Sequence, residues 1–303
     1  MERQISFFVM TYKGWSTLKH VLQHYKPLVS LVVAARDQGL QDDYYEQTKA
    51  LCASYQIPFF DRKNAPRPTS PYAIAISWRW MIDTTQSRLI TLHDSLLPRY
   101  RGFNPLVSAL INGDSAIGVT ALWANENYDS GDIIDQTKLE IQYPMTIRQA
   151  IEKVAPLYQE LVVKICQQIA QGKLPVAIPQ DDTKATYSVW RDAQDYFINW
   201  QRDSKYIQRF VDAVGHPYAG AKTYINGQEL VKIEEAEAIE DVAVFDRAAQ
   251  IGKVIFLREH QPVVVCGEGL LKIKKMKNQQ GQSYNLKQFR VRFTTNPSLD
   301  HLP

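Results

Sequence analysis

Short, continuously apolar runs alternate with amphipathic stretches along the first half of the chain. Because strands of a parallel sheet are covered on both faces, such runs predict buried strands. They lie at residues 5–10, 28–35, 57–60 and 72–77. Helical patterns at residues 16–24 and 44–55 separate them, with a turn expected at residues 11–14. This succession of strand and helix is typical of an open α/β sheet.

A long amphipathic helix is predicted after Thr146, which forms a capping-box pattern with Gln149. Its apolar positions recur at steps of three and four residues. They are Ile147, Ile151, Val154, Tyr158, Leu161 and Ile165. Gly172 ends the helix, and a polar, proline-containing linker follows. We therefore expect a first domain over residues 1–175 and a second over residues 176–303.

The pattern of the second half differs from that of the first. A helical segment is expected within residues 187–214, and apolar and polar residues then alternate in several short runs. Asn-Gly and Gly-Glu-Gly turns separate these runs. Many short strands with such turns predict a small β-barrel-like domain.

Candidate chemistry gathers between Leu89 and Ile133. The apolar run 89–92 ends at His93, and a Leu-Leu-Pro turn with an Arg/Tyr/Arg/Gly loop follows at once. Asp129 comes 36 residues after His93, in a polar loop behind a second apolar strand over residues 118–123. If two neighbouring strands end at one edge of a sheet, this imidazole and this carboxylate meet there. That arrangement suits acid–base chemistry on a substrate bound at the strand ends.

The motif HDSLLPRYRG, followed by DSGDII, resembles the folate-dependent formyltransferases. That family includes methionyl-tRNA formyltransferase, glycinamide ribonucleotide transformylase and the sugar N-formyltransferases. Its pattern is Asn-x-His-x-Ser-Leu-Leu-Pro with a later Asp-x-Gly. The resemblance places the family histidine at His93 and the family aspartate at Asp129, whereas the family asparagine falls on Thr91. The stretch HPYAGAKTYINGQELVKI resembles, more loosely, the OB-like domain of methionyl-tRNA formyltransferase.

The resemblance implies an open, mostly parallel sheet of formyltransferase type, followed by a small OB-like β-barrel domain. It also implies 10-formyl-tetrahydrofolate as the co-substrate. The pterin ring would lie between two loops. One loop carries Ser77, Trp78, Arg79 and Trp80, and the other carries Asn125, Asn127 and Asp129. Trp78 and Trp80 either stack on the pterin or simply pack in the core.

In formyl transfer, His93 would donate a hydrogen bond to the oxyanion of the tetrahedral intermediate. Asp129 would orient the imidazole and help take the proton that leaves the amine. Thr91 offers one hydroxyl on a shorter arm than the carboxamide it replaces. Losing one oxyanion donor typically costs about a hundred- to a thousandfold in rate. Either another donor compensates or the chain is a poor catalyst. Asn104, Asn125 and Asn127 are the candidates, unless Thr91 only packs its methyl group.

Three functions remain open. The first is a sugar N-formyltransferase that acts on a nucleotide-linked amino sugar, and we favour it. Its diphosphate would meet basic side chains and the loop after the Leu-Leu-Pro turn. These residues are Lys13, Arg79, Arg99, Tyr100, Arg101 and Gly102. The second is methionyl-tRNA formyltransferase, supported by the OB-like domain and the KIKKMK run at 272–277, although such a run is more often a solvated strand edge. The third is a catalytically weak relative that binds folate or sugar.

Composition adds limits to these functions. A net charge of +3 is too small to indicate nucleic-acid binding by itself. Three distant cysteines give no disulfide framework, which favours the reducing cytoplasm. The apolar run at residues 5–10 is too short to cross a membrane. A metal site formed by Asp129, Asp132 and Asp135 is not favoured, because alternating strand faces would separate the three carboxylates. A homodimer is left open.

Overall fold

The computed structural model describes residues 4–295 of the chain. These residues form two compact units, each described by itself. The first unit comprises the chain up to Leu106 together with Ser115–Ile141 and Gln149–Val189. The second comprises Val107–Asp114, Gln142–Arg148 and the described chain from Trp190 onward. None of the helices in residues 4–295 combines the length and apolarity needed to cross a membrane.

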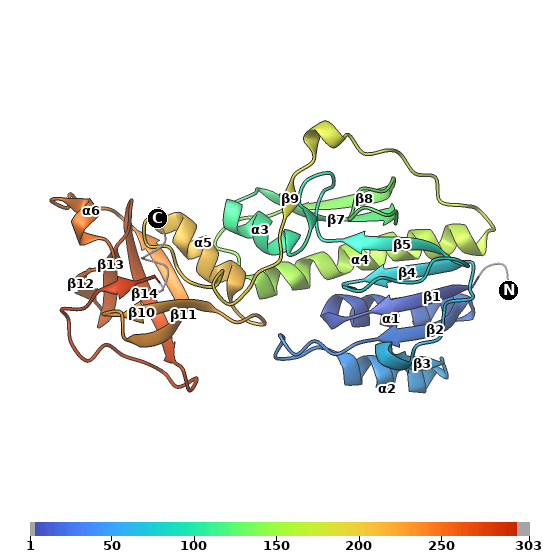
Figure 1. The fold of residues 1–303 in the computed structure, drawn as a ribbon, viewed down its shortest axis with the longest axis horizontal. Coiled ribbons are helices and arrows are strands. Elements are labelled where there is room, and N and C mark those ends of the chain that lie inside the picture. The colour runs from blue at the N-terminus through green and yellow to red at the C-terminus, as the bar shows by residue number, and fades with distance from the viewer. Residues whose placement is uncertain (1–3, 296–303) are drawn as a thin grey trace. The chain divides into compact units, whose positions relative to one another are not determined.

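A seven-stranded sheet is the centre of the first unit (Figure 1). In spatial order it contains β3 (Phe59–Asp61), β2 (Val29–Ala34), β1 (Ile5–Val9), β4 (Tyr72–Ile76), β5 (Arg88–His93), β7 (Ala116–Trp123) and β8 (Ile133–Glu140). The first five pair in parallel, which confirms the open, mostly parallel sheet. β7 pairs antiparallel with both β5 and β8, so among these seven strands it alone runs against the rest.

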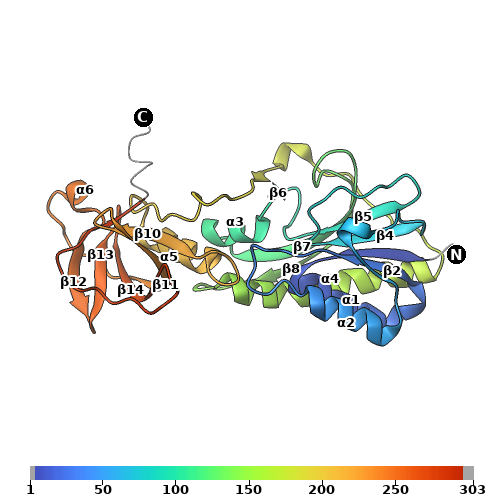
Figure 2. The ribbon, with the colours of Figure 1, turned by 60° about the horizontal axis from the view of Figure 1, so that its bottom comes forward.

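Helices cover one face of this sheet. Figure 2 shows α1 (Thr11–Tyr25), α2 (Tyr45–Tyr55) and α4 (Ile147–Ala170) on the same side. The turn predicted at residues 11–14 is wrong, because α1 begins at Thr11 and Gly14 donates the first helical hydrogen bond to Met10. A Cβ at Gly14 would lie 3.0 Å from that of Val9, so the glycine lets the helix approach the strand. The predicted apolar face of α4 is confirmed; Tyr158 is 1% exposed.

The other face of the sheet is covered by loops. The chain passes from β3 to β4 and from β4 to β5 without an α-helix. Phe8, Val33, Ala73 and Ala75 form a buried cluster on this face, with Trp78 packed against it. β8 was not predicted, because its sequence IIDQTKLE is polar and most of its side chains are only half-buried.

The second unit contains a six-stranded antiparallel sheet. In spatial order its strands are β12 (Val254–Arg258), β13 (Gln261–Val265), β14 (Leu270–Asn278), β11 (Glu229–Ile239), β10 (Ala221–Ile225) and β15 (Phe293–Thr294). Backbone hydrogen bonds from Val254 to Val291 (3.2 Å) and from Phe293 to Gly252 (2.7 Å) connect its two edges. Other short elements among the described residues include β6 (Arg101–Gly102), α3 (Pro105–Asn112), β9 (Tyr187–Ser188) and α6 (Arg247–Gln250).

The helical segment predicted within residues 187–214 is confirmed only for α5 (Ser204–Val214). Asp203 caps this helix by accepting a hydrogen bond from the Tyr206 N–H. The part before the cap is not helical, because residues 187–188 pair with β6 instead. Tertiary pairing therefore overrides the local pattern there.

The lysine run at 272–277 is not a strand edge, because β14 lies between β13 and β11. Its four lysines each lie within ion-pair distance of glutamates, most of them on β11. Lys277 is 2.7 Å from Glu234, and Lys274 is 3.2 Å from Glu237. The run is therefore neutralised by cross-strand pairs.

Asp212 on α5 is a buried carboxylate, 9% exposed, and its Oδ2 has no hydrogen-bond partner among the described residues. Burial, together with the charge of Glu235, raises its pKa to about 6. Lys274 opposes this shift without cancelling it. The ionised form is therefore costly in the folded state.

We predict that Asp212→Asn stabilises the protein at neutral pH. Because the pKa of Asp212 is higher in the folded than in the unfolded state, its protonated carboxyl group contributes stability below about pH 4. That contribution is lost as the pH rises through about 6. Asparagine does not titrate, so the gain should grow from pH 4 to pH 7 and reach about 2–3 kcal/mol. Urea unfolding at both pH values measures it, and an equal gain at pH 4 and pH 7 would contradict the assignment.

Candidate active site

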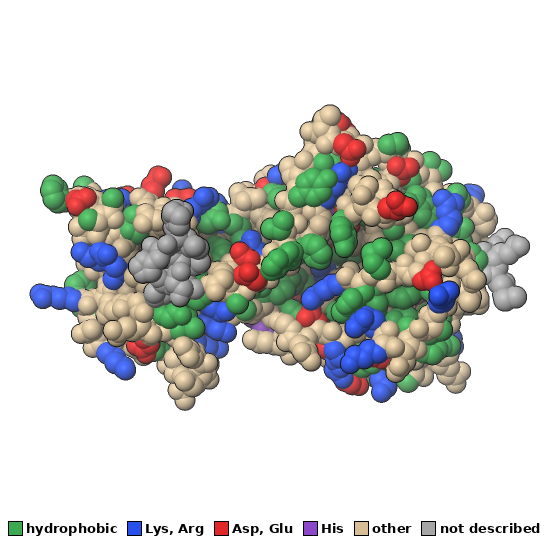
Figure 3. Space-filling model, in the orientation of Figure 1, with side chains coloured by type: hydrophobic (Ala, Val, Ile, Leu, Met, Phe, Trp, Pro, Cys, Tyr) green, Lys and Arg blue, Asp and Glu red, His purple; other side chains and the backbone are tan. Residues whose placement is uncertain are grey.

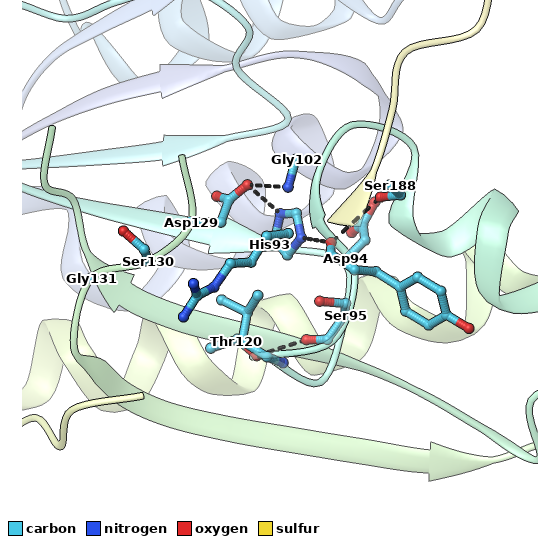
Figure 4. Close-up of polar contacts among 12 residues, drawn as sticks. His93, Asp94, Ser95, Gly102, Thr120, Asp129, Ser130, Gly131 and Ser188 are labelled. Atoms are coloured by element: carbon cyan, nitrogen blue, oxygen red, sulfur yellow. Dashed lines mark hydrogen bonds and ion pairs between the residues drawn. The ribbon is translucent and has the colours of Figure 1, made fainter. Parts of the chain in front are cut away.

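His93 is the last residue of β5, and its side chain is almost completely buried. Its Nε2 lies 2.7 Å from the carbonyl oxygen of Tyr100 (Figure 4). Because a carbonyl oxygen only accepts hydrogen bonds, Nε2 carries the proton in this contact. The contact fixes the plane of the imidazole and directs Nδ1 to the opposite side.

The backbone of Tyr100 is held in an uncommon conformation. Its φ is +59°, a region that bulky residues rarely adopt. The Tyr100 N–H donates to the Thr186 hydroxyl (2.9 Å), and the Arg101 N–H donates to the Thr186 carbonyl (2.8 Å). These two bonds turn the Tyr100 carbonyl toward His93. Thr186, which is distant from His93 in the sequence, therefore helps to orient the imidazole.

Asp129 lies on the Nδ1 side of the ring. Its Oδ2 is 3.5 Å from Nδ1 and also accepts a hydrogen bond from the Gly102 N–H at 2.9 Å (Figure 4). Asp129 has a φ of +52°, which aspartate tolerates better than most residues. At Gly102, whose φ is +96°, a Cβ would lie 2.6 Å from the Ser188 carbonyl oxygen. Only glycine therefore fits at that position.

His93 and Asp129 meet, but the predicted reason is wrong. β7 runs antiparallel to β5, so Trp123 at its end lies beside Ile90 near the start of β5. The loop over residues 124–132 must fold back along β5 to bring Asp129 to His93. Gly131 permits this return, because a Cβ there would lie 1.7 Å from the Trp123 carbonyl oxygen.

Gln180 holds the returning loop, and the sequence patterns did not identify it. Its Nε2 donates to the carbonyls of Asp129 (2.8 Å) and Gly131 (2.7 Å). Its Oε1 accepts from the guanidinium of Arg101 at 2.8 Å. A single polar residue in a linker carries no local signal for such a role.

Side chains of β7 and β8 anchor the Leu-Leu-Pro turn. The Thr120 hydroxyl donates to the Ser95 carbonyl (2.7 Å) and accepts from the Leu97 N–H (3.2 Å). Gln136 donates to the Leu97 carbonyl at 2.8 Å. Thr120 is the strand partner of both His93 and Gln136. The same residue therefore contacts the Leu-Leu-Pro turn and pairs with the histidine.

Two family models match the chain. The one described as "Formyl transferase" matches residues 78–165, and the one described as "Formyl transferase, C-terminal domain" matches residues 191–293. The chain belongs to the formyltransferase superfamily. The resemblance predicted from the His93 and Asp129 motifs is thus confirmed.

Methionyl-tRNA formyltransferases are among the relatives of this superfamily member. That of Halothermothrix orenii is 35% identical over 186 residues, which are 61% of this chain and 58% of the relative. That of Moorella thermoacetica is 32% identical over 193 residues, or 64% of this chain and 60% of the relative. In both comparisons the match spans less than two thirds of the relative's length.

Solved structures share the fold. WlaRD, a sugar 3N-formyltransferase crystallised with dTDP and 5-N-formyl-THF, has a TM-score of 0.68 at 16% identity, covering 90% of this chain and 98% of that chain. The Helicobacter canadensis N-formyltransferase, in complex with folinic acid and dTDP-3-aminofucose, has a TM-score of 0.66 at 17% identity and covers 93% and 99%. The methionyl-tRNA formyltransferase of Clostridium thermocellum reaches 0.53 at 17% identity and covers 78% and 93%.

Thr91, at the position of the family asparagine, lies on the same face of β5 as His93. Its strand partners are Ala75 and Leu122. Asn104 is half-buried, with a φ of +50°. Within residues 4–295, no hydrogen bond or ion pair joins Asn104 or the Asn125 side chain to His93 or Asp129. Compensation for Thr91 by these asparagines or by Asn127 stays a prediction.

Asn125 instead supports its own loop. Its side-chain oxygen accepts hydrogen bonds from the Asn127 N–H (3.0 Å) and from the Ser130 hydroxyl (3.1 Å). These bonds shape the exposed turn that leads to Asp129.

The loop after β4 contains the predicted tryptophans. Trp78 packs edge-on against Phe8, with ring centroids 5.3 Å apart, and against Trp80 at 5.2 Å. The Arg62 guanidinium lies 4.3 Å from the Trp80 ring centroid. Ser77 has a φ of +53° and its hydroxyl accepts from Thr11. Trp78 thus packs on the core, while its buried Nε1 has no hydrogen-bond partner among the described residues.

The basic residues predicted to bind the diphosphate differ in their burial. Lys13 is buried in an ion pair with Asp94, and Arg101 is buried against Gln180 and Asp182. Exposed guanidinium groups belong to Arg79, which pairs with Asp37, and to Arg99, which lies 5.1 Å from the Tyr100 ring centroid. Lys13 and Arg101 therefore have structural partners already.

We predict that Lys13→Met strongly destabilises the first unit. The side chains of Lys13 and Asp94 are 10% and 13% exposed, so the substitution would leave a buried carboxylate whose remaining partner is the Tyr158 hydroxyl. Such losses typically cost about 3–5 kcal/mol. Chemical denaturation measures the cost.

A matched control lies on the same helix. Lys19 is exposed over Trp15, and Lys19→Met should change the stability by less than about 0.5 kcal/mol. The double variant Lys13→Met/Asp94→Asn should recover part of the loss. Equal stabilities for Lys13→Met and Lys19→Met would show that the buried pair is unimportant.

Proposed function

We propose that this protein transfers a formyl group from 10-formyl-tetrahydrofolate to the amine of a nucleotide-linked amino sugar. The contact among His93, Asp129 and Gly102 is the observation that carries the proposal. It puts an imidazole, a carboxylate and a fixed backbone N–H at one position. The imidazole can donate to the oxyanion and the carboxylate can accept the amine proton, which are two roles that acyl transfer to an amine requires. The backbone N–H holds the carboxylate in place.

The reaction joins the amine nitrogen to the formyl carbon and then breaks the bond between that carbon and N10 of the folate. His93 stabilises the oxyanion of the intermediate when Nδ1 is protonated, because Nε2 is committed to the Tyr100 carbonyl. Asp129 accepts the proton from the attacking amine. The departing N10 takes up the proton that Asp129 accepted, so Asp129 returns to the carboxylate and charge is balanced over the cycle. The Gly102 N–H keeps the Asp129 carboxylate in place meanwhile.

The residues fit a folate donor. The Trp78 Nε1 is buried and has no partner among the described residues, and a pterin supplies hydrogen-bond acceptors. Trp80 presents a half-buried ring on the same loop. WlaRD and the Helicobacter canadensis enzyme bind 5-N-formyl-THF and folinic acid, as their names state.

Two observations favour a nucleotide sugar over tRNA as the acceptor. The fold likeness to the two sugar enzymes covers almost the whole of each chain, whereas that to the Clostridium thermocellum enzyme covers 78% of this one. The lysines of residues 272–277 lie within ion-pair distance of glutamates, so this run does not present the unpaired basic stripe of a nucleic-acid surface.

Methionyl-tRNA formyltransferase remains the second candidate, favoured by the 35% identity to the Halothermothrix orenii enzyme. The hydrogen bonds that connect the two edges of the second sheet support an OB-like barrel in either case. A catalytically weak relative is the third candidate, and Thr91 is its support. A cytoplasmic location is part of the proposal.

We predict that purified protein with 10-formyl-tetrahydrofolate formylates at least one amino sugar in a panel linked to dTDP, UDP or GDP. Mass spectrometry detects the gain of one formyl group. His93→Gln and Asp129→Asn should each lower kcat/KM at least a hundredfold, since each removes a group acting on the transition state. Formylation of initiator methionyl-tRNA but of no sugar would support the second candidate instead.

We predict that Gln180→Ala lowers kcat about tenfold or more, because Asp129 loses the side chain that holds its loop. Gln180→Glu should be no better, since a carboxylate cannot donate to the two carbonyls. Asp182→Asn is the matched control; Asp182 pairs with the same Arg101 but is largely exposed. If Asp182→Asn impaired turnover as much as Gln180→Ala, the effect would belong to Arg101 and not to the loop.

A further inference from the structure

Two exposed aromatic rings flank the contact between Asp129 and Gly102. Phe103 directly follows Gly102, and Tyr128 directly precedes Asp129. Their ring centroids are 5.9 Å apart with a 51° angle between the planes. Phe103 is 39% exposed and Tyr128 is 67% exposed. The hydrogen bond that positions the carboxylate therefore also brings these two rings together at the surface.

Hydrogen bonds hold the backbone on both sides of the ring pair. The Gly102 N–H bonds the Asp129 carboxylate, and the Phe103 N–H donates to the Ser188 carbonyl at 2.9 Å. Gln180 holds the Tyr128 side through the carbonyls of Asp129 and Gly131. Large aromatic surface left exposed on a rigid support is a common feature of sites that bind flat ligands.

An exposed arginine lies on the same loop as Phe103. Arg99 is exposed on the loop that leads to Phe103, and its guanidinium lies over the Tyr100 ring. Figure 3 shows hydrophobic side chains at the surface over β5, β8 and β9, with both basic and acidic side chains beside them. A flat ring joined to phosphate is the ligand that this combination of aromatic and cationic groups fits.

We infer that Phe103 and Tyr128 bind the nucleobase of the acceptor by stacking. The inference rests on the proposed function and adds the part of the acceptor that the chain recognises. Trp78 and Trp80, which we propose lie near the folate, follow β4, whereas this pair lies on the loops that follow His93 and lead into Asp129. The donor and the acceptor would then use different aromatic pairs, since Phe103 contacts Tyr128 and Trp78 contacts Trp80.

The test is calorimetric binding of dTDP, UDP and GDP to the full chain. We expect at least one to bind, and Phe103→Ala and Tyr128→Ala each to weaken that binding about tenfold or more, as losses of base stacking do. Tyr128→Phe keeps the ring and should bind like the wild type. Phe245→Ala is the control, since Phe245 is 95% exposed in the second unit.

The affinity for 5-formyl-tetrahydrofolate separates the two substrates and checks that the variants are folded. It should stay within about twofold of the wild-type value in Phe103→Ala and Tyr128→Ala. A fall in folate binding with unchanged nucleotide binding would place the rings on the donor side and overturn the inference. Absence of binding by all three nucleotides, or equal binding by the alanine variants, would overturn it as well.

The formylation assay keeps this test distinct from that of the proposed function. If nucleotide binding depends on both rings but no nucleotide-linked amino sugar is formylated, the stacking site stands and the proposed reaction fails. If formylation occurs with an unchanged KM in both alanine variants, the reaction stands and the stacking site is rejected.

Discussion

Contacts of Asp129 connect the loops of the candidate active site to one another. Its Oδ2 accepts the Gly102 N–H at 2.9 Å and faces His93 Nδ1 at 3.5 Å, while its own carbonyl accepts from Gln180. Four chain segments, from β5, the β6 loop, the β7–β8 loop and the linker after α4, therefore meet at one residue. A charged acceptor with fixed donors is a strong and directional constraint.

The two faces of the sheet are covered differently, which leaves one face open to the loops that meet at Asp129. α1, α2 and α4 cover one face, so the loops occupy the other, where His93 and Trp78 lie. On the helical side the buried pair of Lys13 and Asp94, with the Tyr158 hydroxyl, ties α1 and α4 to the residue after His93. His93 is thus supported by packing on the helical side, and on the loop side it contacts the Tyr100 carbonyl and the Asp129 carboxylate.

In the second unit, opposite charges on neighbouring strands lie within ion-pair distance of each other. The lysines of β14 face glutamates of β11 and Glu259, and the six-stranded sheet joins its edges by backbone hydrogen bonds. The residues that we propose for the reaction lie in the first unit. There Phe103 and Tyr128 are the sequence neighbours of Gly102 and Asp129, which is why we expect recognition of the acceptor to begin beside the proposed site.

The sequence by itself determined the parallel strands, the buried face of α4 and the superfamily, because apolar periodicity and the His93 motif are local properties. It also identified His93 and Asp129, but not how they meet. Only the tertiary structure decided that β7 runs antiparallel, that α1 begins at Thr11, and that the lysine run lies in a central strand. Strand direction and neighbours depend on contacts between distant segments, and no local pattern encodes them. For the same reason Gln180, a lone polar residue in a linker, became visible only through the two carbonyls it holds.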